Sequence, residues 1–265
     1  MERFKNKVCL VTGAGSGIGR ATALAFGREG AKVVVVDVNL ENAEKTAEIL
    51  RNEIPTQSAL RGGNDTVLAL KVDISNREDV ENMLKKTVET FGRLDCAVNC
   101  AGIAGTVSLP THEYPFDEWH QQININLTGT WYCMKFQITQ MLQNGGGTIV
   151  NLSSAAGLIA QPENSPYAAS KHGVVGITKT AAREYATKNI RINAICPTAI
   201  ETPMLMEGRR KLAHNPEAKQ AAINFQAMKR MGTPEEIADV ALWLCSEHSS
   251  FITGLAMAAD GGALA

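Results

Sequence analysis

A tyrosine and a lysine four residues apart are the chain's clearest candidates for proton transfer. Tyr167 and Lys171 lie in the segment YAASKHGVVGITKTAAREYA, whose pattern predicts a helix, so both side chains share one helix face. A lysine beside a tyrosine stabilises the phenolate and lowers the pKa of the tyrosine from its ordinary value of roughly 10. Such a phenol can donate and accept a proton near neutrality. Beside a hydride carrier, this pair would support reversible alcohol–ketone chemistry.

The same residues admit ordinary structural explanations. A tyrosine on a helix is usually a packing residue, as Tyr185 on the same predicted helix is expected to be, and a lysine four residues later is commonplace. Ser154, thirteen residues before Tyr167, could simply cap a turn. The functional interpretation therefore depends on evidence for a hydride-carrier site elsewhere in the chain.

A glycine-rich turn near the N-terminus supplies that evidence. The segment Thr12–Gly19 (TGAGSGIG) follows an apolar strand and opens a helical pattern. A strict GxGxxG motif fails at Ile18, but Gly13, Gly17 and Gly19 fit the pattern TGxxxGxG. Glycines at these positions permit a tight turn and a close approach of the backbone to a pyrophosphate.

Asp37 ends the next predicted strand, near the offset of roughly 20 residues expected in a dinucleotide-binding unit. Its carboxylate could accept hydrogen bonds from the adenosine ribose hydroxyls and would repel a 2′-phosphate. Ser16 and Val38 occupy the two positions where an Arg or Lys could neutralise that phosphate. The sequence therefore predicts NAD in preference to NADP. The alternative is that Asp37 only caps a turn.

Short apolar runs alternate with helical patterns along the whole chain. Strands are predicted at Lys7–Thr12, Lys32–Asp37, Val67–Val72, Leu94–Asn99, Thr148–Leu152, Ile190–Cys196 and Leu255–Ala259. Helices are predicted at Gly17–Gly30, Glu41–Asn52, Glu78–Phe91, Phe116–Leu142, Pro166–Thr187 and Pro234–Cys245. Strands that are apolar on both faces and alternate with helices indicate a covered parallel sheet. We therefore expect an α/β fold: a Rossmann-type, doubly wound parallel seven-stranded sheet with helices on both faces.

No linker, composition shift or internal repeat divides the chain, so a single NAD-binding catalytic domain is expected over residues 1–265. Three irregular stretches, Gly102–Pro115, Ala155–Pro166 and Pro197–Gly232, follow the carboxyl ends of predicted strands, where open α/β sheets bind ligands. The last, about residues 197–232, is the expected substrate loop. The stretch Glu53–Thr66 precedes a strand and is expected to be a surface loop away from that edge.

Charge and composition argue against several other classes of protein. The formal net charge is -1, which gives no electrostatic case for nucleic acid or an acidic membrane surface. No stretch approaches the roughly 18 apolar residues of a membrane span, and the N-terminus lacks a signal-peptide pattern. The six cysteines and five histidines show no metal-ligand spacing. We therefore expect a cytoplasmic protein with reduced thiols and no bound metal.

As a set, these motifs resemble those of the short-chain dehydrogenase/reductase family, in its common branch of about this length, over essentially all 265 residues. TGAGSGIG looks like that family's coenzyme loop, and Val72-Asp73-Ile74 resembles the segment whose Asp bonds the adenine amino group. Asn99-Cys100-Ala101-Gly102 resembles its NNAG motif, with cysteine in place of the second asparagine. The resemblance implies cofactor contacts at Gly13, Ser16, Gly17, Ile18, Gly19, Asp37, Val38, Asp73, Ile74, Asn99, Ala101, Gly102, Tyr167, Lys171, Pro197, Ile200 and Thr202.

The resemblance also implies a catalytic tetrad. Asn126 in the segment NINL matches the family's asparagine, whose backbone carbonyl holds a water that links the lysine to solvent. Ser154 matches the catalytic serine, and Tyr167-Ala168-Ala169-Ser170-Lys171 matches Tyr-x-x-x-Lys. In this scheme Ser154 stabilises charge on the substrate oxygen, Tyr167 transfers the proton, and Lys171 holds the phenolate and the nicotinamide ribose.

One departure from the family pattern follows the sixth predicted strand, where Pro-Gly reads Pro197-Thr198. Replacing the glycine with threonine removes backbone freedom close to the nicotinamide. Further on, Ile200 and Thr202 match positions that contact the nicotinamide carboxamide.

Apolar residues around the predicted site suit a hydrophobic ketone or secondary alcohol, cyclic or aryl, although they could equally be ordinary core or interface residues. The expected substrate contacts are Ser154, Leu158, Tyr167 and Met204. Small residues along Pro166–Thr187 permit close helix approach, and the family resemblance implies a homotetramer built on this helix and the long helix before it.

Two other functions are compatible with the same fold. An NAD(H)-sensing regulatory protein would bind the cofactor without turnover, although the intact Ser154, Tyr167 and Lys171 set argues against it. A lyase or epimerase that uses bound NAD catalytically usually needs a larger C-terminal substrate domain than this chain provides.

Overall fold

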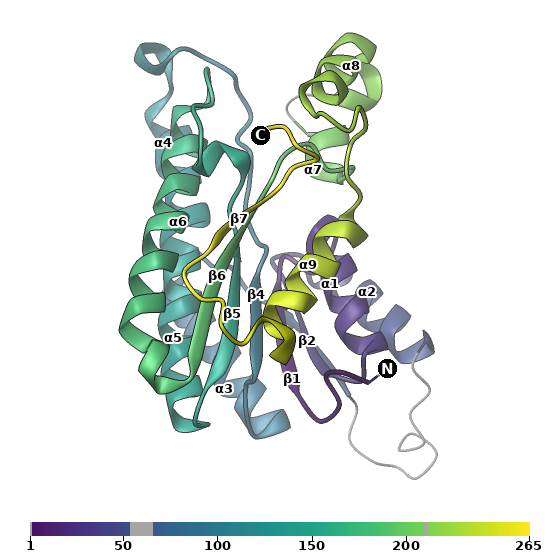
Figure 1. The fold of residues 1–265 in the computed structure, drawn as a ribbon, viewed down its shortest axis with the longest axis vertical. Coiled ribbons are helices and arrows are strands. Elements are labelled where there is room, and N and C mark those ends of the chain that lie inside the picture. Colours follow the sequence, from purple (N-terminus) through teal and green to yellow (C-terminus); the bar gives the residue numbers. More distant parts are fainter. Residues whose placement is uncertain (1, 54–65, 209–210) are drawn as a thin grey trace.

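The structure, a computed structural model, describes residues 2–53, 66–208 and 211–265. It contains a seven-stranded parallel sheet of order β3-β2-β1-β4-β5-β6-β7 (Figure 1). The strands are β1 (Val8–Thr12), β2 (Lys32–Asp37), β3 (Val67–Lys71), β4 (Cys96–Asn99), β5 (Gly147–Leu152), β6 (Ile190–Pro197) and β7 (Ala256–Ala259). This architecture confirms the predicted doubly wound sheet. The strand order reverses between β1 and β4, and open α/β sheets bind ligands at such a switch point.

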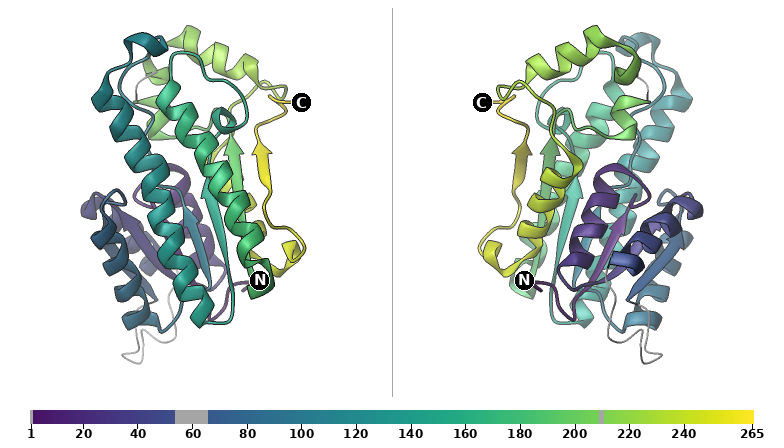
Figure 2. Two further views of the ribbon diagram at one scale, coloured as in Figure 1. Left: turned by 90° about the vertical axis from the view of Figure 1, so that its left-hand side faces the viewer. Right: turned by 90° about the vertical axis from the view of Figure 1, so that its right-hand side faces the viewer.

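Helices cover both faces of the sheet (Figure 2). One face carries α1 (Gly17–Arg28), α2 (Leu40–Glu53) and α9 (Pro234–Cys245). The other carries α3 (Arg77–Phe91), α4 (Phe116–Ile123), α5 (Thr130–Gln143) and α6 (Ser165–Tyr185). Two short helices, α7 (Pro203–Met206) and α8 (Pro216–Phe225), lie beyond the carboxyl ends of the strands, at the top of Figure 1. Single 3-10 turns occur at Thr111–Glu113, Ala155–Gly157, Ala186–Lys188, Leu212–His214 and Glu247–Ser249.

Alternating residues of the central strands fill two separate cores. In β1, Cys9 and Val11 face the core under α1 and α9, whereas Val8 and Leu10 face the core under α3 and α5. The run Val33–Val36 in β2 is likewise fully buried, which explains why this strand lacks the polar alternation of a half-exposed one. Burial of each such side chain contributes about 1.5–3 kcal/mol. The central strands, whose carboxyl ends carry the candidate site, are therefore packed against a hydrophobic core on each face of the sheet.

The long helix predicted at Phe116–Leu142 is continuous but changes its winding. Helix α4 runs into a π-helical turn (Asn124–Gly129), and this turn runs into α5. Single π-turns inside α-helices occur often at functional sites. Asn126, a predicted catalytic residue, lies within this turn.

The stretch Pro197–Gly232 contains more regular structure than expected, because α7 and α8 both lie within it. Helix α8 begins at Pro216, and the Asn215 side chain caps it by accepting the Ala218 N–H at 3.0 Å. The prediction of an irregular segment was therefore wrong here, although Asn-Pro is a helix-start signal. The surface loop predicted at Glu53–Thr66 lies almost entirely outside the described residues.

Candidate active site

The turn between β1 and α1 is built for close contact with other loops. Gly13 has φ +65°, and a Cβ on it would lie 2.8 Å from the Cα of Ala101, in the loop after β4. Gly17 has φ +50°, and a Cβ there would lie 3.3 Å from the Cβ of Thr202, which follows β6. Both positions need glycine for backbone conformation and for space. The turn thus brings together segments that follow three different strands.

The same turn forms the start of α1, which suits a phosphate group. Ser16 is the N-cap residue, and within the described part of the chain its side chain makes no capping hydrogen bond to the first helical turn. The N–H groups of that turn, which includes Ile18 and Gly19, and the helix dipole favour an anion. A Cβ on Gly19 would overlap the carbonyl oxygen of Gly13, so the helix packs directly on the turn. These residues fit the pyrophosphate of a dinucleotide.

Asp37 stands at the carboxyl end of β2, beside the glycine turn. Its carboxylate accepts hydrogen bonds from the Gly15 N–H at 2.9 Å and from the Asn39 N–H at 3.0 Å. Asp37 therefore does fix local turns, the structural role that the sequence left open. A carboxylate has further lone pairs, which can accept from a ribose. Val38, another predicted contact, is exposed beside it.

The two residues predicted near the adenine follow β3 and differ in exposure. Asp73 is exposed, and its Oδ1 accepts hydrogen bonds from the Ser75 N–H at 2.9 Å and the Ser75 hydroxyl at 2.7 Å. Ile74 is buried, and its Cδ1 would lie 2.9 Å from a Cβ on Gly129. Asp73 thus presents a polar group at the surface, whereas Ile74 packs against the π-helical turn.

The Asn99 side chain takes part in a buried polar network. Its Nδ2 donates to Gln137 Oε1 at 3.0 Å and to Asn151 Oδ1 at 2.8 Å, and its Oδ1 accepts from Gln137 Nε2 at 2.8 Å. Asn151 in turn donates to Thr178 Oγ1 at 2.9 Å. The network joins β4, β5, α5 and α6. Because this amide points into the protein, any cofactor contact at Asn99 would involve its backbone.

Lys171 is a buried cation at the carboxyl edge of the sheet. Only 5% of its surface is exposed, and its Nζ donates to the Leu152 carbonyl oxygen at 2.8 Å. The same Nζ lies 5.6 Å from the centre of the Tyr167 ring. Burial lowers the pKa of Lys171 to about 8, while the side chains of Cys100 and Cys196 favour the cation. Tyr167 itself is half-buried.

Asn126 anchors the loop after β4 beside this lysine. Its Oδ1 accepts the Ile103 N–H at 2.8 Å, and its Nδ2 donates to the Ile103 carbonyl at 2.9 Å. A Cβ on Gly102 would lie 3.0 Å from Asn126 Oδ1 and 3.6 Å from Lys171 Nζ. The fold therefore brings Asn126 to the pair Tyr167 and Lys171, which is predicted from a separate motif.

Two neighbouring serines differ in environment. Ser153 is buried, and its hydroxyl donates to the Lys171 carbonyl at 2.9 Å. Ser154 is half-buried, and its Oγ accepts the Ala156 N–H at 3.1 Å, which caps the turn Ala155–Gly157. Because Ser154 is the acceptor in that bond, it keeps its own proton to donate. Its environment favours Ser154 over Ser153 as the residue that meets a substrate.

Thr198, the departure from the family pattern, ties the loop after β6 to the chain beyond β7. Its hydroxyl lies 3.0 Å from Gln226 Oε1 and 3.2 Å from the Asp260 carbonyl oxygen. Pro197 and Ile200 on either side of it are buried. The threonine therefore adds a link that a glycine could not make.

Three residues outside the predicted site, Glu118, Gln122 and Tyr114, also contact the loop after β4 or each other. Glu118 Oε2 accepts the Thr106 N–H at 3.2 Å, and Gln122 Nε2 donates to Tyr114 Oη at 3.3 Å. A spacing of four residues places Glu118, Gln122 and Asn126 on one face of the predicted helix. This spacing is the sequence signal that could have identified Glu118 and Gln122.

Across residues 2–53, 66–208 and 211–265, no group of three or more His, Cys, Asp or Glu side chains is placed to hold a metal ion. No helix in the same ranges is long and apolar enough to cross a membrane.

Comparison with known proteins gives matches over nearly the whole chain. A family model described as enoyl-(acyl carrier protein) reductase matches residues 13–263. The cyclohexanol dehydrogenase of Acinetobacter sp. (strain SE19) is 41% identical over 260 residues, which cover 98% of this chain and 96% of that protein. The 2,5-dichloro-2,5-cyclohexadiene-1,4-diol dehydrogenase of Sphingobium indicum (strain DSM 16413) is 38% identical over 263 residues, which cover 99% of this chain and 98% of that protein.

A solved structure extends the similarity to three dimensions. The crystal structure of levodione reductase has a TM-score of 0.91 against this chain at 38% sequence identity, and the match covers 98% of each chain.

Proposed function

The chain belongs to the short-chain dehydrogenase/reductase family, and from that premise we propose that it transfers a hydride between NAD(H) and a hydrophobic secondary alcohol or ketone. The observation that carries the proposal is the buried ammonium of Lys171, 5.6 Å from the centre of the Tyr167 ring. Burial disfavours a charged lysine. A cation kept there despite that cost, beside a half-buried phenol, supports a role in proton transfer.

The chain's own residues would handle the proton and the substrate oxygen. When bound, NAD(H) would accept or supply the hydride. Tyr167 would take the hydroxyl proton in oxidation and return it in reduction, and Ser154 would donate a hydrogen bond to the same oxygen. Lys171 would stabilise the phenolate through its charge. Asn126 would hold the neighbouring loop at Ile103, through the two hydrogen bonds described above.

Asp37 supports a preference for NAD over NADP. Two backbone N–H groups orient its carboxylate, which would accept hydrogen bonds from the ribose and repel a 2′-phosphate. Ser16 and Val38 supply no compensating positive charge. The proposed cofactor contacts are those expected from the family: Gly13, Ser16, Gly17, Ile18, Gly19, Asp37, Val38, Asp73, Ile74, Asn99, Ala101, Gly102, Tyr167, Lys171, Pro197, Ile200 and Thr202.

A cyclic or aryl substrate is the proposed class. Two relatives are named for ring alcohols, a cyclohexanol and a dichlorocyclohexadienediol. Apolar side chains are exposed on the segments after β5 and β6: Ile159 is 39% exposed, Met204 43% and Phe225 55%. Such surface suits a hydrophobic ring. The proposed substrate contacts are Ser154, Leu158, Tyr167 and Met204.

We further propose that residues 1–265 form a single catalytic domain with a substrate loop at about 197–232, and that four copies assemble through α5 and α6. Trp131 on α5 is 47% exposed in the single chain, and a second copy packed on α5 would bury this large apolar side chain. A size-exclusion mass near 28.4 kDa would count against a tetramer. The six cysteines are free thiols, which suits the reducing cytoplasm.

The function is tested by following absorbance at 340 nm with NAD and with NADP against cyclic, aryl and sugar alcohols and the matching ketones. We expect turnover of a cyclic or aryl alcohol with NAD strongly preferred. Equal use of NADP would show that Asp37 is misassigned. Tight NADH binding without turnover of any compound would instead indicate a cofactor-sensing protein.

A further inference from the structure

Side chains on one face of α4 and the π-helical turn after it bind the loop after β4 at two points. Asn126 holds Ile103 through both of its backbone groups, at 2.8 and 2.9 Å. Two turns earlier, Glu118 accepts the Thr106 N–H at 3.2 Å and also bonds the Thr106 hydroxyl. This loop starts beside Lys171, because a Cβ on Gly102 would lie 3.6 Å from its Nζ. Residues 103–109 therefore continue from a point beside Lys171 and are held against the helix by Asn126 and Glu118.

Gln122 lies between these two anchors and is fully buried. Gly105, with φ +75°, lies over it, and a Cβ on that glycine would be 2.8 Å from Gln122 Cδ. Among the described residues, the buried Oε1 of Gln122 has no hydrogen-bond partner. An apolar side chain of similar size would avoid the cost of that unpaired oxygen, about 1–3 kcal/mol. We therefore take the role of the Gln122 amide to be the orientation of the Tyr114 hydroxyl, to which its Nε2 donates at 3.3 Å, rather than stabilisation of the fold.

The Tyr114 hydroxyl joins this loop to the start of the helix that carries Tyr167. It lies 3.1 Å from the Val107 carbonyl oxygen and 3.2 Å from Asn164 Oδ1, and its single proton can serve one of them at a time. Asn164 is the N-cap residue of α6, three residues before Tyr167, and only 2% of its surface is exposed.

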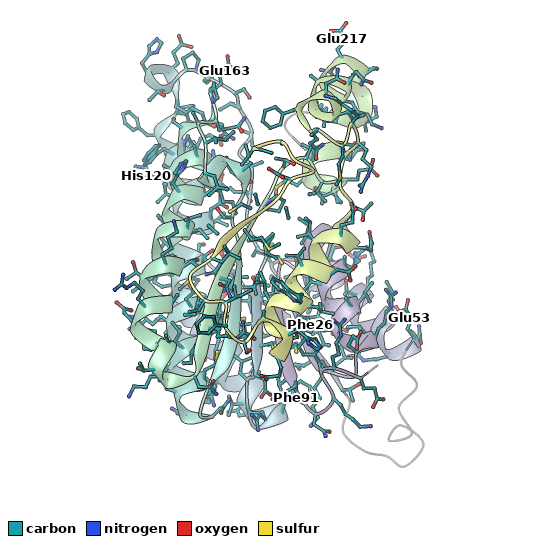
Figure 3. The ribbon with its side chains drawn as sticks, in the orientation of Figure 1. Phe26, Glu53, Phe91, His120, Glu163 and Glu217 are labelled. Carbon is teal, nitrogen blue, oxygen red and sulfur yellow. The ribbon has the colours of Figure 1, made fainter. Side chains whose placement is uncertain are left out.

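Besides the hydrogen bonds of the Tyr114 hydroxyl, a backbone hydrogen bond joins the same two segments. The Leu109 N–H donates to the Glu163 carbonyl at 3.1 Å, and Glu163 is labelled at the upper edge of the molecule in Figure 3. Both links join the loop after β4 to the segment that leads into α6. The loop and the catalytic helix are thus connected by side-chain and backbone bonds outside the predicted catalytic residues.

We infer that Tyr114 is a positioning residue that, through Gln122 and Asn164, fixes the 103–109 loop relative to Tyr167 and so sets the width of the substrate site. The inference rests on the proposed function, because only a substrate between this loop and Tyr167 would sense that width. Tyr114 does not act on the reacting atoms. Its loss should therefore affect substrate fit more than the chemical step or cofactor binding.

The kinetic test compares Tyr114→Phe with Tyr185→Phe, which removes a phenol hydroxyl from the far end of α6, where Tyr185 packs against the core. For Tyr114→Phe we expect KM for a cyclic alcohol to rise about three- to tenfold, the equivalent of one net hydrogen bond. We expect a smaller change for a short acyclic alcohol, and unchanged kcat and KM for NAD. Tyr185→Phe should alter none of these values.

Amide hydrogen exchange provides a readout that does not depend on activity. In Tyr114→Phe, and in Gln122→Met, the amides of Thr106 and Leu109 should exchange about three- to tenfold faster than in the wild-type protein, without a lower melting temperature for Gln122→Met. Exchange and KM both equal to wild type would overturn the inference. If the wild-type protein oxidises no alcohol, the proposed function fails, and the exchange rates alone still decide whether Tyr114 couples the two segments.

Discussion

The Lys171 ammonium donates to the Leu152 carbonyl oxygen at 2.8 Å and lies 5.6 Å from the centre of the Tyr167 ring. One carbonyl oxygen from the end of β5 is a modest replacement for the water that a lysine normally binds. Burial consequently lowers the pKa of Lys171 to about 8. The site therefore holds a charge that the folded protein disfavours, which is typical of functional rather than structural lysines.

Replacing Lys171 with Met removes that disfavoured charge at similar volume. The folded-state pKa of about 8 lies below the ordinary value of 10.5, so the unfolded chain binds the proton more tightly. The free-energy cost of keeping the charged lysine in the folded protein is fully present below pH 8 and disappears as the pH rises toward 10.5. Measured by urea unfolding, the stability of wild type relative to Lys171→Met should rise by about 2 kcal/mol between pH 7 and pH 10.

Lys171→Arg is the control for that experiment, because a guanidinium does not titrate in this range. Its stability relative to Lys171→Met should stay constant with pH. A wild-type protein that also shows no pH dependence relative to Lys171→Met would mean that the lysine is not desolvated in solution.

The glycine turn can be tested by a matched pair of alanine substitutions. Gly13 and Gly92 have φ of +65° and +82°, so alanine is strained at both, at about 1–2 kcal/mol. A Cβ on Gly13 would also lie 2.8 Å from the Cα of Ala101, whereas a Cβ on Gly92 meets nothing within 4 Å among the described residues. Gly13→Ala should therefore lower the free energy of unfolding by about 1–3 kcal/mol more than Gly92→Ala does. Equal losses would contradict the packing of the turn against the loop after β4.

The two serines after β5 should differ in their effect on kcat, although both stabilise the fold. Ser154→Ala removes the half-buried hydroxyl proposed to bond the substrate oxygen, and kcat should fall by about a hundredfold. The same change removes the cap of the turn Ala155–Gly157, so the free energy of unfolding should also fall, by about 0.5–2 kcal/mol. Ser153→Ala removes a buried bond to the Lys171 carbonyl, and the free energy of unfolding should fall by about 1 kcal/mol. Steady-state kinetics and urea unfolding on both variants test this assignment. A larger loss of kcat for Ser153→Ala would reverse it.

The sheet and the glycine turn could be predicted because their signals are local. KVVVVD is apolar at every central position, and TGAGSGIG carries its glycines within eight residues, so neither needs knowledge of distant contacts. The four-residue spacing of Tyr167 and Lys171 likewise fixed their relation before any tertiary structure was known. Burial of the lysine, which lowers its pKa, depends on packing and was not predicted.

Other parts of the site depend on contacts between distant segments. The Tyr114 hydroxyl meets Asn164, 50 residues later, and the Asn99 amide meets Asn151, 52 residues later. A pattern within a short stretch of sequence cannot predict contacts between residues so far apart in the chain. The π-helical turn at Asn124–Gly129 also escaped prediction, because its sequence fits an ordinary helix. These elements support the predicted residues from outside their motifs.

Steady-state oxidation of a cyclic secondary alcohol by Tyr167→Phe, with Tyr185→Phe as control and NADH binding measured on both, tests the central claim most directly. We predict that Tyr167→Phe loses turnover by about a hundredfold or more, the scale of general acid–base catalysis, while NADH binds normally and Tyr185→Phe is fully active. A Tyr167→Phe variant that turns over at near wild-type rates would contradict the proton-transfer role on which the proposed activity depends.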